Sequence, residues 1–315
     1  MEAMHVPVLV EETIHWLAPR KGGELMVDST LGEGGHSYAF LSRFPELNVI
    51  GVDVDPIIQE IARERLKVFG ERIRFHSGWA QDFFRAYPKE SRRPDTILID
   101  LGISLFHYEK SGRGFSFRKD EALDMRLDPL LGPGAAELIA TLGERELADL
   151  LYANAEERYS RRIAGAIVEA RRRGALRSSR ALGEVVEQAV PPSYRNGPLH
   201  PATKTFLALR IAVNGELARL RDLLEAALLV LEPRGRLGVI SFNSGEDRIV
   251  KGFFREQRRD CTHPMEAPIH RMDDCTVVLL NPRGTGPTEM EKRVNPPSRS
   301  ARLRVVEKLR VKDES

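Results

Sequence analysis

The stretch that decides the fold reads LMVDSTLGEGGHS over residues 25–37. A short apolar run, Leu25 to Val27, leads through a glycine-rich turn directly into residues of helical character. A strand followed by such a turn and helix is typical of the first unit of a parallel α/β sheet. Glycines let the backbone approach a ligand closely, and the helix N-terminus offers free N–H donors, although the same turn also serves simple chain reversal.

The strand–helix alternation continues on the C-terminal side of this stretch. Further apolar runs predict strands at 49–52, 73–75 and 96–99, and amphipathic stretches predict helices at 37–44, 56–69 and 81–86. Residues 135–188 are almost purely helical in character, and the strand pattern resumes at 236–242 and 276–280. We therefore expect one open, doubly covered α/β sheet that is interrupted after its fourth strand by a helical insertion.

Acidic residues follow three of the predicted strands. Asp53 lies about 20 residues beyond the glycine turn, where a carboxylate can hold ribose hydroxyls, and Asp55 before Pro56 is placed to cap a helix. The turn lacks the G-x-G-x-x-G fingerprint of dinucleotide sites, and its acids Asp28 and Glu33 suit a cationic ligand better than a phosphate. These features favour S-adenosylmethionine (SAM) over NAD.

Composition excludes several classes of protein. The chain is 42% hydrophobic and 30% charged, with 48 Lys and Arg against 46 Asp and Glu. No run approaches the roughly 20 apolar residues that span a bilayer, and the two cysteines make no disulfide framework, so we expect a soluble cytoplasmic protein. Residues 156–180 hold eight arginines against three acids, a cluster that fits either a phosphate footprint or a solvated helix face.

Motifs along most of the chain resemble the ribosomal RNA small subunit methyltransferase H family, also called MraW. The matching stretches lie in family order at residues 5–9, 28–37, 52–56, 100–104, 113–117, 123–126, 200–206, 208–214, 246–251, 295 and 298–304. The resemblance implies a seven-stranded SAM-dependent methyltransferase sheet at 1–105 and 206–285. It also implies an all-helical, RNA-recognising insertion at 106–205. A basic C-terminal tail is expected at 286–315, after the second part of the sheet.

The resemblance also implies an activity: methyl transfer from SAM to N4 of a cytosine in the decoding region of 16S rRNA. The partner is then 16S rRNA or the small ribosomal subunit, and the sequence leaves open which of the two is used and whether the chain forms a homodimer. By position, the family's SAM contacts map onto Gly34, Gly35, His36, Asp53, Trp79, Asp100 and His107.

Two sets of residues are candidates for handling the RNA. Asp100, or Ser104 close behind it, is expected to accept a hydrogen bond from the target amine and so act as the catalytic residue. Arg113, Phe115 and Phe117, together with Arg126, combine rings and cations as proteins that bind splayed-out RNA do. The rings also fit a structural role that pins the insertion to the sheet.

Two departures from the family pattern leave alternatives open. His107 stands where the family usually has Gln, and Asn243 stands where it has a His able to carry a proton. A catalytically impaired rRNA-binding homologue that retains SAM binding is therefore an alternative, and an NAD(P) oxidoreductase is a weaker one. No metal site is expected, because the spacing of Cys261, His263, His270 and Cys275 matches no standard zinc arrangement.

Overall fold

The computed structural model describes residues 7–130, 132–259 and 276–309, without the side chain of residue 259. The chain divides into two compact units. The sheet unit comprises Met1–Gly102 and Arg219–Ser315, and the helical unit comprises Ile103–Ala218. The insertion expected at 106–205 thus extends to 103–218. The four Cys and His residues weighed as zinc ligands lie outside the described residues.

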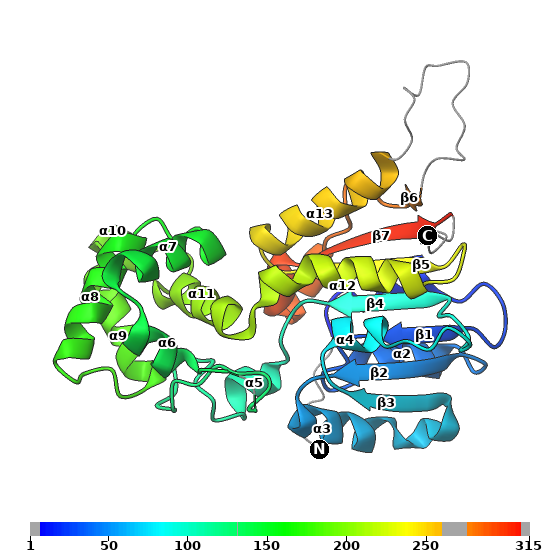
Figure 1. Cartoon of the computed structure of the whole chain (residues 1–315), viewed down its shortest axis with the longest axis horizontal. Helices are drawn as coiled ribbons and strands as arrows, with labels where there is room; N and C mark the ends of the chain where they lie inside the picture. The colour runs from blue at the N-terminus through cyan, green and yellow to red at the C-terminus, as the bar shows by residue number, and fades with distance from the viewer. Residues whose placement is uncertain (1–6, 131, 260–275, 310–315) are drawn as a thin grey trace, which may run out of the picture. The chain divides into compact units, whose positions relative to one another are not determined.

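A seven-stranded sheet forms the centre of the sheet unit, in the order β3-β2-β1-β4-β5-β7-β6 (Figure 1). The first five strands along the chain run parallel, and β7 is antiparallel to both of its neighbours. The strands are β1 (Leu25–Asp28), β2 (Asn48–Asp53), β3 (Ile73–Ser77), β4 (Thr96–Asp100), β5 (Arg236–Ser241), β6 (Val277–Leu279) and β7 (Arg302–Lys308). The six strands predicted from apolar runs are confirmed.

Alternation of side chains along the strands builds a core on each face of the sheet. Val27 and Ile97 pack on one face with α4, α12 and α13, whereas Met26 and Leu98 pack on the other with α1, α2 and α3 (Figure 1). The helices are α1 (Val10–Leu17), α2 (Gly35–Arg43), α3 (Pro56–Leu66), α4 (Ala80–Arg85), α12 (Glu216–Val230) and α13 (Ser244–Arg259). Both faces of the sheet are therefore covered, as an open parallel sheet requires.

Residues 286–315, expected as a basic tail, include the strand β7, and this corrects the prediction. Val305 and Val306 are buried in the two cores, and the cations between the apolar positions have internal partners. Arg304 pairs with Asp247, and the Lys308 ammonium donates to three carbonyls at the end of α12. Charged residues hid the strand pattern because Arg304 and Lys308 have hydrogen-bond partners remote in sequence.

The helical unit has its own core. No strand is found in its described residues. Its helices are α5 (Leu105–Glu109), α6 (Ala135–Thr141), α7 (Glu144–Ala155), α8 (Ser160–Arg172), α9 (Ser179–Ala189), α10 (Pro192–Arg195) and α11 (Ala202–Asn214). Buried Leu147, Ile163 and Leu182, from α7, α8 and α9, pack in one cluster. In the described parts of both units, no helix is long and apolar enough to cross a membrane.

Candidate active site

Three carboxylates meet at one edge of the sheet, because β1, β2 and β4 are parallel and end on Asp28, Asp53 and Asp100. The strand order reverses between β1 and β4, which are hydrogen-bonded neighbours. Ligands of open α/β sheets bind beyond the carboxyl ends of the strands at such a switch point. The topology thus places these three carboxylates, which we call the acidic edge, at the end of the sheet where a ligand is expected.

Asp53 organises the turn that follows β1. Its Oδ2 accepts the backbone N–H of Gly32 (2.7 Å), and its Oδ1 accepts that of Asp55 (2.9 Å). The fully buried Asp55 in turn accepts the N–H of Ile57 (3.0 Å) as the N-cap of α3, which confirms the predicted cap. The Asp53 carboxylate is thus fixed at the end of β2, where ribose hydroxyls are expected.

The glycines of the turn are required by packing inside the protein. Gly34 has a φ of +75°, and a Cβ there would lie 2.8 Å from Leu66 Cδ1. A Cβ on Gly35 would lie 2.9 Å from Pro7 Cγ. The structure therefore explains both glycines by close approach of neighbouring side chains, whereas the sequence suggested approach of a ligand. Their cofactor contact stays a prediction.

His36 lies beside two acids and has no hydrogen bond from either ring nitrogen. Its Nε2 is 3.6 Å from Asp100 Oδ2, and its side chain is 6% exposed. Asp28 is buried; its Oδ2 accepts the Ser37 hydroxyl (2.7 Å), but its Oδ1 has no partner. Burial raises the pKa of Asp28, although His36 and the bond from Ser37 oppose the shift. Asp28 Oδ1 thus remains an acceptor without a hydrogen-bond partner at this end of the sheet.

Asp100 is held in place by Thr30, in the turn after β1, and by Gly102 in its own loop. Its backbone N–H donates to Thr30 Oγ1 (2.6 Å), and its Oδ1 accepts the N–H of Gly102 (3.2 Å). A Cβ on residue 102 would lie 2.7 Å from the ring of Phe242, so a larger residue there would force that ring to move. The Asp100 side chain is 20% exposed, with Oδ2 turned toward His36. A fixed and partly open carboxylate is suited to receive a cation or an N–H donor.

Trp79 precedes α4 with one face of its indole covered. The Arg219 guanidinium lies 4.3 Å from the ring centroid, and the buried indole N–H has no hydrogen-bond partner. A buried N–H without a partner costs about 1–3 kcal/mol, which a ligand acceptor would relieve. The predicted contact with adenine is therefore expected at the other face of the Trp79 indole or at its N–H edge.

Ser104 and His107 belong to the helical unit and have local roles there. Ser104 is the N-cap of α5, with Oγ accepting the N–H of Phe106 (3.1 Å). His107 is 4% exposed, and its ring packs edge-on against Phe115 at 5.3 Å. A catalytic role for Ser104 and a SAM contact for His107 stay predictions.

Two of the residues predicted to contact RNA are buried in the structure, and their contact with RNA stays a prediction. Phe115 is 3% exposed and packs in the core of the helical unit. Arg113 is 8% exposed, and its Nη1 donates to the carbonyls of Arg126 (2.9 Å) and Leu127 (3.0 Å). Both residues hold the loop to the core of the helical unit. The alternative that the rings of Phe115 and Phe117 pin the insertion to the sheet stays a prediction.

Phe117 and Arg126 are less deeply buried. Phe117 stacks on His200, with ring centroids 4.2 Å apart and an interplanar angle of 14°. Arg126 forms a two-point ion pair with Asp124, whose pKa the Arg126 hydrogen bonds hold below its usual value. Phe117 thus stays a candidate for contact with RNA, and Arg126 contributes less net charge than its sequence suggests.

A hollow in the helical unit was missed by the sequence reasoning. His200 lines it together with Arg158, Tyr194 and Lys204. The Arg158 guanidinium lies 4.8 Å from the ring of Tyr194 and also 4.8 Å from that of Tyr159. Apart from Arg158, the residues that line it all belong to the segment 193–204.

A protein-family model described as the MraW methylase family matches residues 2–309. The chain belongs to the MraW methylase family. It is 55% identical over 310 residues to a ribosomal RNA small subunit methyltransferase H of Treponema denticola, covering 98% of each chain. Proteins of the same name from Treponema pallidum (43% identical; 96% of this chain and 92% of that one) and Syntrophobacter fumaroxidans (44%; 96% of each) are also similar.

Asn243, the residue that departs from the family's His, has a structural role in this MraW methylase. Its Oδ1 accepts the N–H of Glu246 (3.0 Å), while Glu246 Oε2 accepts the N–H groups of Phe242 (2.7 Å) and Asn243 (3.3 Å). This reciprocal capping starts α13, and Asn is among the strongest capping residues. Asn243 therefore serves to begin this helix.

The structure offers no metal site to this methylase in the parts it describes. Among residues 7–130, 132–259 and 276–309, no group of three or more His, Cys, Asp or Glu is arranged to hold a metal ion.

Proposed function

We propose that this MraW methylase transfers the methyl group of SAM to N4 of a cytosine in the decoding region of 16S rRNA. The observation that carries the proposal is the acidic edge at the switch point, where Asp28, Asp53 and Asp100 follow three adjacent parallel strands. The name shared by the relatives supports small-subunit rRNA as the substrate. None of these names supports the alternative of an impaired homologue.

The residues at this edge fit SAM. Asp28 Oδ1, which has no hydrogen-bond partner, and the partly exposed carboxylate of Asp100 suit its positive charges, and Asp53 stands where the ribose hydroxyls are expected. The unpartnered indole N–H of Trp79 fits an acceptor on the adenine. When bound, SAM supplies a methyl group on a good leaving group, so the protein need not activate the donor.

The protein's task is then to prepare the amine. The N4 amine of cytosine is conjugated with its ring and is a weak nucleophile. An acceptor on one N–H favours the pyramidal nitrogen and disperses the positive charge that develops on it. Asp100 is our candidate for that acceptor, since its carboxylate is fixed by Gly102 and partly open. Holding the amine in line can supply several kcal/mol of the barrier.

The helical unit is proposed to bind the RNA around the target base. Chemistry on a base edge requires that the base leave its stack. The stacked rings of Phe117 and His200, with Arg158 and Lys204 nearby, combine aromatic faces with cations as single-stranded RNA sites do. With small subunits or their rRNA as the substrate, the site of action is the cytoplasm.

The test is methyl incorporation from radiolabelled SAM into small subunits that lack the modification, into naked 16S rRNA and into already modified subunits. Label at a single cytosine N4 in unmodified material, absent from modified subunits, is the expected result. S-Adenosylhomocysteine should also raise the melting temperature, and NAD should not. Ligand stabilisation without methyl transfer to either RNA form would refute the proposed activity.

A further inference from the structure

A row of cations lies along α13 of the sheet unit. Arg248, Lys251, Arg255 and Arg258 occupy positions i, i+3, i+7 and i+10, so they share one side of the helix at about one per 5.4 Å turn. Three of them are exposed and Lys251 is half-buried. We call these four residues the α13 stripe. Phe253 and Phe254 fix the helix to the core of the sheet unit, so the stripe has a fixed direction.

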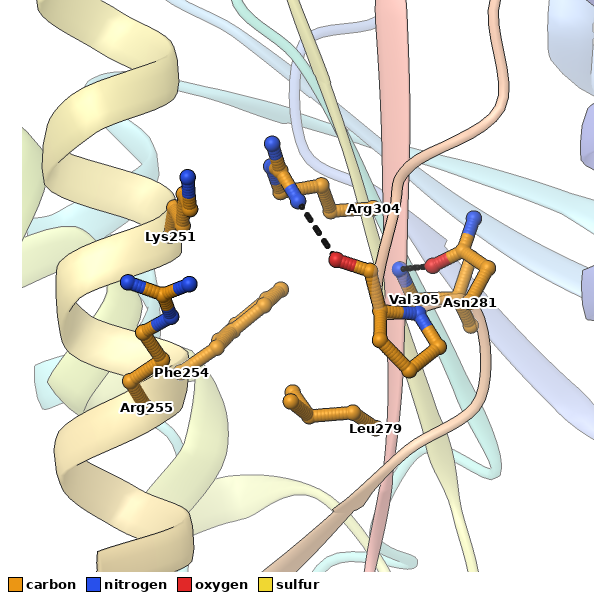
Figure 2. Close-up of a pocket in the computed structure, with 8 residues that line it drawn as sticks. Lys251, Phe254, Arg255, Leu279, Asn281, Arg304 and Val305 are labelled. Atoms are coloured by element: carbon orange, nitrogen blue, oxygen red, sulfur yellow. Dashed lines mark hydrogen bonds between the residues drawn. The ribbon is translucent and has the colours of Figure 1, made fainter.

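The middle of the α13 stripe borders a groove between α13 and β7 (Figure 2). Lys251 and Arg255 line it from the helix, and Arg304 lines it from the strand. Phe254 and Leu279 supply apolar walls beneath these cations. Because apolar side chains replace part of the water around the half-buried Lys251, its charge is screened less than that of a fully exposed lysine.

The acids of α13 are committed to other groups. Asp247 holds Arg304 through two hydrogen bonds (2.7 and 3.0 Å), Glu256 pairs with Arg221 (2.7 Å), and Glu246 caps the helix. Within the described part of the chain, neither Lys251 nor Arg255 forms an ion pair within 4 Å. The groove is therefore net positive through these two residues, although the whole chain has a net charge of only +2.

We propose that the α13 stripe and its groove bind the phosphodiester backbone of the RNA substrate, as a contact carried by the sheet unit in addition to those of the helical unit. A row of cations one helical turn apart matches the repeated charges of a nucleic-acid strand, whereas a single anion would need one pocket only. The inference rests on the proposed function, because it takes the RNA to be the methylation substrate.

The experiment measures RNA binding by fluorescence anisotropy from about 50 to 300 mM salt, with a labelled RNA hairpin that carries the target cytosine. The test variant is Lys251→Gln/Arg255→Gln. The matched control is Lys67→Gln/Arg74→Gln, which removes two exposed cations from η1 (Lys67–Arg72) and β3 of the same unit. Thermal melting and S-adenosylhomocysteine titration of each variant check that fold and cofactor site are retained.

We expect the test variant to bind about 10-fold more weakly near 0.1 M salt, and the slope of log affinity against log salt to fall by about 1.4 to 1.8 for two lost phosphate contacts. The control should change both by much less. An unchanged slope and affinity in a folded test variant would overturn the inference. So would a loss confined to methylation of assembled subunits, which would indicate a protein contact.

These outcomes are separable from the proposed activity. If the wild type transfers no methyl group to any small-subunit RNA, the proposed function fails, whatever the salt slopes show. If the wild type methylates normally and the two double variants bind RNA alike, only the assignment of the α13 stripe fails.

Discussion

Replacing Asp100 with Asn should weaken SAM binding strongly while leaving the fold intact. The substitution preserves size, and the new amide oxygen can still accept the N–H of Gly102, which now lies 3.2 Å from Asp100 Oδ1. The other oxygen, 3.6 Å from His36 Nε2, becomes an NH₂ group that donates where a cation or amine needs an acceptor. The change thus removes one charge and one acceptor from the edge.

The expected magnitude follows from that geometry. A hydrogen bond to a charged group contributes about 1.5–3 kcal/mol, so SAM affinity should fall by about 10- to 150-fold. The bare Coulomb energy at 4 Å is about 4 kcal/mol at an effective dielectric of 20, and this sets an upper limit. At saturating SAM the methylation rate should fall as well if the same carboxylate accepts the amine N–H.

Titration calorimetry with SAM and with S-adenosylhomocysteine is the assay. S-Adenosylhomocysteine has no sulfonium charge, so an equal loss for both ligands assigns Asp100 to the amino acid end, and a larger loss for SAM assigns it to the sulfonium. Asp82→Asn, at a largely exposed carboxylate of α4, is the matched control. SAM affinity within twofold of wild type, together with an undiminished methylation rate, would refute both roles of Asp100.

Three stability predictions follow from other contacts. Gly34→Ala should cost about 1–3 kcal/mol more than Gly23→Ala, because both positions have positive φ but only the Cβ at Gly34 meets another side chain; equal melting temperatures would contradict this. Lys308→Met should lower the free energy of unfolding by about 2–4 kcal/mol in urea titrations, since three helix-end carbonyls lose their donor; an unchanged value at neutral pH would remove the capping role. For Asp247, burial works to raise the pKa of the carboxyl, but the hydrogen bonds and charge of Arg304 outweigh it and the net shift is downward. The stability that wild type has over Asp247→Asn should therefore be complete above about pH 4 and decline as the pH falls below it; a difference that grows on acidification would show the opposite shift.

Local sequence signals determined much of the sheet unit. Apolar runs marked six of the seven strands, and Asp55 before Pro56 marked the start of α3, because these signals act within a few residues. The acids after β1, β2 and β4 were visible as well. That they share one edge follows from parallel pairing, which the strand–helix alternation already implied.

The tertiary structure decided what local patterns cannot encode. The strand β7 looked like a charged tail, because the hydrogen-bond partners of Arg304 and Lys308 lie 57 and 77–80 residues away. Phe115 looked like a ring for RNA until the packing of the helical unit buried it. The sequence by itself determined which chemical groups this methylase carries and at which strand ends they stand. Only the folded chain decided which of those groups are already paired inside the protein and which remain to meet a ligand, because partners are chosen by proximity in space.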